Sequence, residues 1–103
     1  MPTPGDVPNW HATFTATADV QTGTIWAQGA LEIFTIEYLR GEVDLLRRHG
    51  CTQLRLELGR LIALDQTAAN YLRVLAGELA AAGGALMLLN CREPVRSRVQ
   101  DLL

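Results

Sequence analysis

The spacing of apolar positions changes several times along the chain, and each change predicts a new element. Residues 10–18 alternate between small or aromatic apolar residues on one side and threonine on the other, which is typical of a half-buried strand. Residues 24–28 are predicted to pair with it as a hairpin across the turn-like segment 19–23. This second strand is expected to stop at the sequence GALE of residues 29–32.

Three other segments carry apolar residues three or four positions apart, as one face of a helix requires. The first is predicted over residues 35–49 and ends at Gly50, after basic residues that suit the C-terminal end of a helix. The second is predicted over residues 66–82. The last helix is expected to cover residues 93–102, with Pro94 in its first turn.

The strand predicted over residues 51–58 alternates again and indicates how the sheet is covered. Its leucines share one face and its polar side chains the other: Leu54, Leu56 and Leu58 against Gln53, Arg55 and Glu57. A strand covered on both faces would be apolar throughout, so helices are expected on one face. With a final strand at 85–89, the element order predicts an α/β fold with a single-layer mixed sheet. An N-terminal antiparallel hairpin is followed by parallel strands, with the helices mainly on one face.

A chain of 103 residues with 49% hydrophobic and 19% charged residues suits one domain, predicted over residues 10–103 after a flexible leader at 1–9. Its apolar stretches are far shorter than the roughly 20 residues of a membrane-spanning helix. No secretory signal is recognised at the N-terminus, so we expect a cytoplasmic protein without membrane insertion. The net charge of −2 gives no general attraction for nucleic acid.

The residue types that most often bind metals are scattered along the chain. No CxxC motif and no paired histidines occur, so neither a metal site nor a cofactor is expected. Cys51 opens one parallel strand and Cys91 follows another, which places them at opposite edges of the sheet. A disulfide between them is not expected, because the Cα atoms of a disulfide lie within about 7 Å of each other.

The sequence DQTAA at residues 65–69 joins an apolar run to the second predicted helix. Asp65 suits the N-cap position, which places Thr67 in the first turn, where backbone N–H groups lack partners and the helix dipole is positive. Helices that follow parallel strands begin at the sheet edge where α/β proteins usually hold functional sites. Two interpretations stay open at this point: a helix cap alone, or a hydroxyl that is phosphorylated as a switch.

The stretch RLELGRLIALDQTAANYLRVLAGELAAAGGALMLLN resembles the central part of a STAS domain, the family of bacterial anti-sigma factor antagonists. In that family a strand ends in an acidic residue, matched here by Glu57. The motif Asp-Ser-Ser-Gly then opens a helix, matched by residues 65–68. The GALE of residues 29–32 resembles the family's Gly-Glu-Leu-Asp, and PVRSRVQDLL resembles its closing helix. The resemblance extends over residues 10–103.

The resemblance implies a partner-switching regulator of transcription that itself carries no catalysis. Members of the family bind an anti-sigma factor, a GHKL-type serine/threonine kinase, and thereby free a sigma factor. The kinase phosphorylates the antagonist at the second hydroxyl residue of the motif, here Thr67, and a PP2C-type phosphatase reverses the reaction. The residues that the resemblance assigns to partner binding are Glu32, Asp65, Gln66, Thr67 and Ala68.

Gln66 and Ala68 depart from the Ser and Gly of the family motif, so binding without phosphorylation also fits the sequence. A second interpretation is a STAS module of a transporter or a larger signalling complex. A third is a small α/β enzyme, although no Gly-rich phosphate loop and no GxSxG motif is found. The candidate nucleophiles and bases of such an enzyme are Cys51, Thr67, His49 and His11. The sequence leaves open whether the uncovered face of the sheet forms a homodimer.

Overall fold

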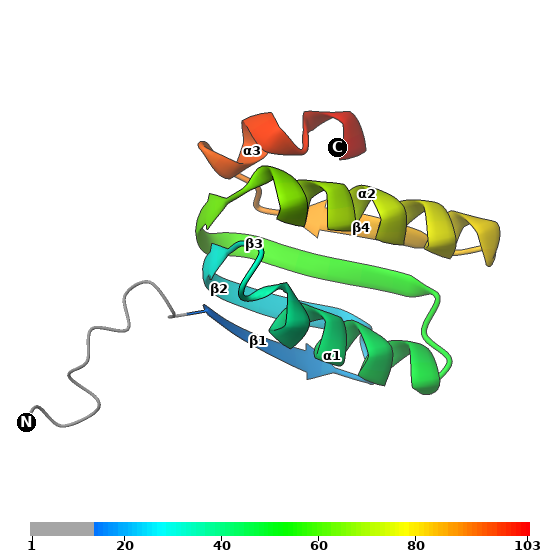
Figure 1. Cartoon of the computed structure of the whole chain (residues 1–103). Coiled ribbons are helices and arrows are strands. Elements are labelled where there is room, and N and C mark those ends of the chain that lie inside the picture. The colour runs from blue at the N-terminus through cyan, green and yellow to red at the C-terminus, as the bar shows by residue number, and fades with distance from the viewer. Residues whose placement is uncertain (1–13) are drawn as a thin grey trace, which may run out of the picture.

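The computed structural model describes residues 14–103 and contains one four-stranded sheet with helices packed against it (Figure 1). The elements in chain order are β1 (Phe14–Asp19), β2 (Thr24–Leu31), α1 (Ile36–Arg48), β3 (Gln53–Leu64), α2 (Gln66–Ala81), β4 (Ala85–Leu89), α3 (Val95–Arg98) and the 3₁₀ turn η3 (Gln100–Leu102). The predicted leader and the first residues of the predicted first strand lie outside the described residues.

The sheet has the strand order β1-β2-β3-β4, with β1 antiparallel to β2 and the other neighbours parallel. This arrangement confirms the α/β prediction of a mixed sheet that begins with an antiparallel hairpin. The chain crosses from β2 to β3 through α1 and from β3 to β4 through α2. Crossovers of one hand place their helices on the same side of the sheet, which explains the one-sided covering.

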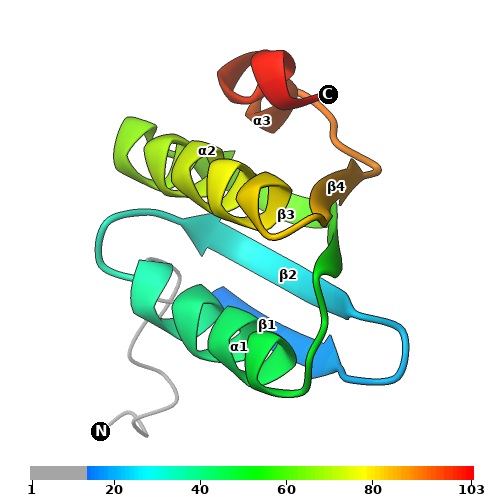
Figure 2. The same ribbon diagram turned by 90° about the vertical axis from the view of Figure 1, so that its right-hand side faces the viewer.

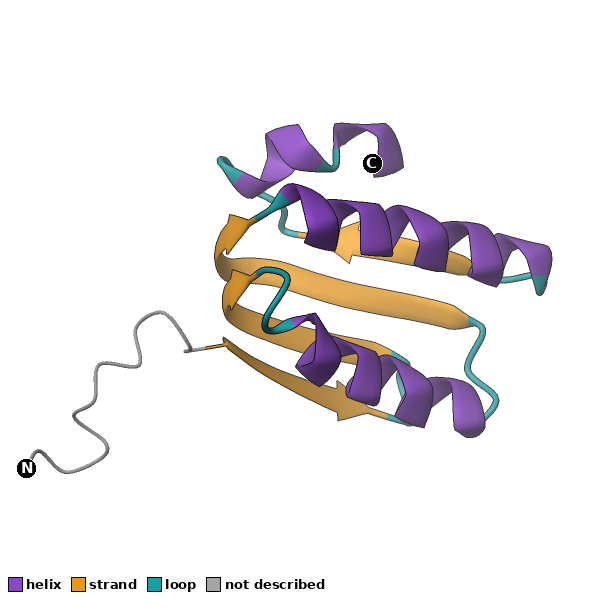
Figure 3. Ribbon diagram, viewed as in Figure 1, coloured by secondary structure: helices purple, strands orange, loops and turns teal. Residues whose placement is uncertain are grey.

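Helices α1 and α2 lie on one face of the sheet, α1 over β1 and β2 and α2 over β3 and β4 (Figures 1 and 3). The side view in Figure 2 shows both helices on the same side of the strands. The leucines predicted to face inward from the third strand are buried, as are the apolar stripes of both helices. The largest fully buried side chains are Ile25, Leu31, Leu39, Leu46, Leu54, Leu56, Leu58, Leu72, Leu75, Leu79, Val43 and Val95.

The third and second strands both run further than the sequence pattern predicted. In the sequence the alternation of this strand ends at Leu58, yet β3 continues to Leu64 and pairs with an extended β2. The reason is a bulge: Trp26 pairs with Glu57, but Gln28 pairs with Arg60, so β3 carries an extra residue. A bulge interrupts the period of two, and the pattern therefore hides the rest of the strand.

The longer strand corrects the position expected for Glu57. This residue does not end β3 but is the last one that pairs with β4, opposite Leu89. Beyond it, no strand among residues 14–103 pairs with that side of β3, and the segment after β4 covers it. The guanidinium of Arg92 donates to the carbonyl oxygen of Gly59, and α3 packs on β3. This covering protects an edge that would otherwise expose free backbone groups.

The prediction of one closing helix over residues 93–102 is wrong. The chain forms only the four residues of α3, with Pro94 at its N-cap, and then the separate turn η3. The helix ends because the backbone leaves the helical conformation at Val99, with φ −126° and ψ 21°. In a continuous α-helix the Arg98 carbonyl would accept the N–H of Leu102. Here it accepts from Arg73 Nη2 at 2.7 Å, and the N–H of Leu102 donates to the carbonyl of Val99 instead.

Arg73 of α2 also holds the C-terminal turn through Asp101, whose carboxylate it meets with two hydrogen bonds of 2.8 and 3.0 Å. The bond from Arg73 lowers the pKa of the Asp101 carboxyl below its ordinary value of 3.8. A lowered pKa in the folded state means that this pair stabilises the fold above pH 3.8 and loses its effect as the pH falls through the folded value.

We therefore expect an NMR pH titration of Asp101 to show a midpoint below 3.8, accompanied by faster hydrogen exchange in η3 as the carboxyl takes up its proton. In an Arg73→Gln variant the midpoint should move back up, because the charged donor is gone. An unchanged midpoint in that variant would show that Arg73 and Asp101 do not interact in solution.

Candidate functional site

The joint between β3 and α2 is built on the side chain of Asp65. Its backbone is extended, with φ −89° and ψ 175°, and its Oδ1 accepts the N–H of Ala68 at 2.8 Å. This is the N-cap geometry that the sequence predicted. The N–H of Asp65 itself donates to the carbonyl of Leu31 at 3.2 Å, which joins the start of α2 to the end of β2.

The second carboxylate oxygen of Asp65 has a different partner. Oδ2 accepts the N–H of Ile33 at 3.0 Å, so the cap residue of α2 also holds the loop between β2 and α1. Thr35 holds the same loop from within: it is buried, and its Oγ1 accepts from the N–H of Glu32 and donates to the carbonyl of Ala30, both at 2.9 Å. The loop between β2 and α1 is therefore held at Ile33 by Asp65 and at Thr35 by its own hydrogen bonds.

Thr67 lies in the first turn of α2 with its side chain exposed. The cap satisfies the N–H of Ala68, and within the described residues the N–H groups of Gln66 and Thr67 have no acceptor. These groups carry the positive end of the helix dipole. The side chain of Gln66 runs along the helix and donates to Asn70 Oδ1 at 3.0 Å.

The residues assigned to partner binding do not all share one surface. Asp65, Gln66 and Thr67 lie at the start of α2, and the half-buried Glu32 lies nearby because its neighbour Ile33 is bonded to Asp65. Ala68 is different: it is 0% exposed and packs in the core. Its side chain is therefore unavailable to a partner, which corrects its place among the contact residues.

An apolar surface beside Asp65 was missed in the sequence. Phe34 is 84% exposed, and its neighbour Ile33 and Tyr38, in the first turn of α1, are also exposed. We call these three residues the apolar loop surface. In the sequence, only the adjacent apolar residues Ile33 and Phe34 pointed to this surface. Because they come just before a predicted helix, they could equally have belonged to its buried apolar face. Large exposed apolar side chains gathered in one place often mark a protein interaction site.

Among the candidate nucleophiles and bases in the described residues, Thr67 lies at one end of β3, and His49 and Cys51 lie at the other. His49 Nδ1 is bonded to the carbonyl of Leu45 at 2.9 Å, and Cys51 precedes β3 at the end of the sheet opposite Asp65. Cys91 follows β4, and burial raises the pKa of its thiol. His11 lies outside the described residues.

Residues 14–103 contain no group of three or more His, Cys, Asp or Glu that could hold a metal ion. None of the helices formed by these residues is long and apolar enough to cross a bilayer.

Comparison with known proteins adds no identity to this geometry: no family model matches the chain, and no curated protein is similar to it in sequence. The feature of the described residues that bears on function is the site at the start of α2. Its features are an exposed hydroxyl at a helix N-terminus, a carboxylate that holds two segments together, and the apolar loop surface beside them.

Proposed function

We propose that this chain is an anti-sigma factor antagonist of the STAS type, which binds an anti-sigma factor kinase and is switched by reversible phosphorylation at Thr67. Binding would free a sigma factor and so regulate transcription. The observation that carries the proposal is the exposed Thr67 hydroxyl at the N-terminus of α2, beside the Asp65 carboxylate. A kinase can reach this hydroxyl without unfolding any element, because no other described side chain covers it.

The apolar loop surface provides the contact area that such a partner needs. Asp65 holds Ile33, and with it Phe34, next to the first turn of α2. A partner that docks on Phe34 would therefore lie close to the start of α2, which carries Thr67. Exposed aromatic side chains of this kind are enriched at protein interfaces.

A phosphate at Thr67 would act on the interface rather than on the fold. It adds up to about two negative charges, which the N–H groups of the first turn favour by roughly 0.3–1 kcal/mol. The same charge lies close to the carboxylate of Asp65, so the surface seen by a partner becomes strongly acidic. Burying that charge in a contact would be costly, and the complex would weaken.

The test is phosphate transfer from ATP in an extract of the organism that makes this protein, followed by peptide mass spectrometry. We expect phosphate on Thr67 and none in a Thr67→Ala variant. Thr52→Ala is the matched control, because Thr52 is also exposed but lies at the opposite end of β3. Labelling of Thr52, or labelling that survives in Thr67→Ala, would contradict the proposal. An absence of phosphate transfer would also contradict it if the anti-sigma factor kinases in the extract are shown to be active on another substrate.

A further inference from the structure

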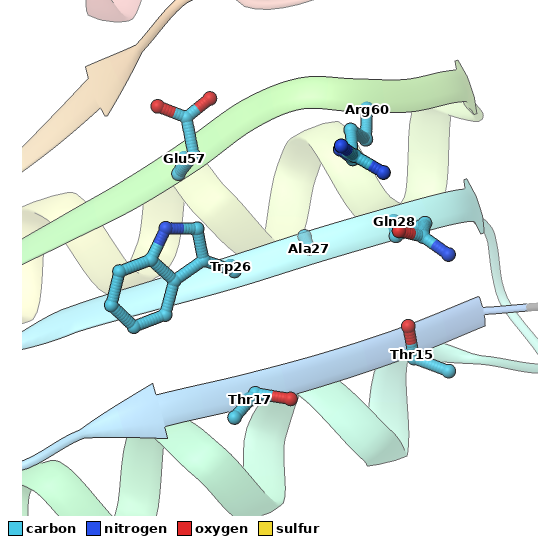
Figure 4. A pocket seen from close by; sticks show the side chains of 7 residues that line it. All are labelled: Thr15, Thr17, Trp26, Ala27, Gln28, Glu57 and Arg60. Carbon is cyan, nitrogen blue, oxygen red and sulfur yellow. The ribbon is translucent and has the colours of Figure 1, made fainter.

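The face of the sheet opposite α1 and α2 has a hollow of about 440 Å³. Figure 4 shows it with the helices behind the strands and with lining side chains from β1, β2 and β3. This site is distinct from the start of α2, where Thr67 lies. Its volume falls within the range of sites that hold small organic molecules.

Trp26 forms the floor of the hollow. It is 48% exposed, which is unusual for so large an apolar side chain, and it pairs across the strands with Thr17 and Glu57. Figure 4 shows the indole ring lying along the sheet, with one face open and its nitrogen on the side of Glu57. A flat aromatic surface of this kind stacks well with another planar ring.

Glu57 is held in place at one side of the hollow. Its Oε1 accepts the N–H of Gly59 at 2.8 Å, and its Oε2 accepts Nδ2 of Asn90 at 2.5 Å. An added Cβ at position 59 would lie 2.9 Å from Glu57 Oε1, so the carboxylate would have to shift from this position. A carboxylate has about four acceptor positions, so Glu57 can still accept a further N–H from a ligand.

Arg60 supplies the opposite charge. Residues three apart face opposite sides of a regular strand, but the bulge in β3 brings Arg60 onto the same face as Glu57. Among residues 14–103 it makes no ion pair, and it lies next to Gln28 of β2. A guanidinium that is free in this way is suited to bind a carboxylate through two parallel hydrogen bonds.

We propose that this hollow binds a small planar aromatic acid whose ring carries an N–H group. The ring stacks on Trp26, the carboxylate pairs with Arg60, and the ring N–H donates to Glu57. Arg60 on β3 pairs with Gln28, which is two residues after Trp26 on β2. This places the Cα atoms of Trp26 and Arg60 about 8 Å apart. Figure 4 shows the indole extending from its Cα away from Arg60, so the carboxylate arm of a ring stacked on Trp26 must point back along β2 toward the guanidinium.

The probe is indole-3-acetate, added to the full chain while the indole N–H signal of Trp26 is followed by two-dimensional NMR. A Trp10→Phe variant identifies which of the two tryptophan signals belongs to Trp26. We expect a saturable shift with a Kd of about 1 mM, ordinary for a ligand of this size. Indole-3-acetamide, which lacks the charge, should bind at least about tenfold more weakly, and naphthalene-1-acetate, which lacks the N–H, severalfold more weakly.

The variant Arg60→Gln should weaken indole-3-acetate at least about tenfold. Arg55→Gln is its control, because Arg55 is exposed on the same strand but does not line the hollow. The proposal is overturned if the Trp26 signal does not move up to about 10 mM probe, or if acid and amide bind equally. It is also overturned if Arg60→Gln binds indole-3-acetate as tightly as the unmodified chain does. A further contrary result is a Trp26 signal that shifts with protein concentration in the absence of probe, which would mean that two copies of the chain pair through this face.

Discussion

Gly84→Ala is expected to lower the free energy of unfolding by about 3 kcal/mol, a large part of the stability of a domain of this size. Gly84 follows α2 and lies against the start of β3. An added Cβ would lie only 1.9 Å from the carbonyl oxygen of Thr52 and 2.5 Å from its carbonyl carbon. Both are backbone atoms, so no side-chain rotation relieves the clash. The strands must separate there, which also weakens the bond from the N–H of Ala85 to the same oxygen.

Urea unfolding followed by circular dichroism measures the effect, and Gly77→Ala is the control. Gly77 lies inside α2, and an added Cβ there meets nothing within 4 Å. That variant should be more stable by about 0.5–1 kcal/mol, because alanine favours the helix. If Gly84→Ala kept the stability of the unmodified chain, the close approach of the α2–β4 turn to β3 would be wrong.

Asp65→Ala is expected to cost about 2 kcal/mol of stability, because it removes the helix cap and the bond to the neighbouring loop together. Ordinary loss of an N-cap costs about 1 kcal/mol. Here both carboxylate oxygens carry a bond, to the N–H of Ala68 and to that of Ile33. The loss of stability beyond that of an ordinary cap thus measures how strongly Asp65 holds the loop before α1 to the start of α2.

Asp65→Asn separates the two contributions. Its single carbonyl oxygen can still accept the N–H of Ala68, but its amide group would face the N–H of Ile33 as a second donor. We expect a loss of about 1 kcal/mol and faster hydrogen exchange at the Ile33 amide, measured by urea unfolding and by NMR. Unchanged exchange at Ile33 in both variants would show that Asp65 acts only as a cap.

The outcome at Asp65 also bears on the proposed switch. If Ile33 is released in Asp65→Asn while α2 keeps its cap, Phe34 is no longer held near the start of α2. Partner binding should then weaken although the hydroxyl is unchanged. Asp65 would thus be a positioning residue for the interface, with no direct role in phosphate transfer.

Most of the fold could be predicted from local spacing. The alternating leucines of β3 indicated a sheet covered on one face, and the helical stripes of α1 and α2 indicated what covers it. Asp65 was recognisable as a cap because a cap is a contact between residues three apart. These features depend on neighbours in the sequence, and the period of the backbone makes them visible there.

What the sequence did not reveal depends on contacts between distant segments. The predicted closing helix breaks at Val99, where Arg73 of another helix binds the Arg98 carbonyl and Asp101 and so holds the chain end in a separate turn. The bulge that brings Arg60 beside Glu57 is a mismatch between two strands, and a mismatch has no pattern within either strand alone. By itself the sequence determined the order and type of the four strands and of α1 and α2, and which faces of the two helices and of β3 are buried. The tertiary structure alone decided that Ile33 meets Asp65 and that Trp26, Glu57 and Arg60 share one hollow, because these groups come together only when separate segments pack.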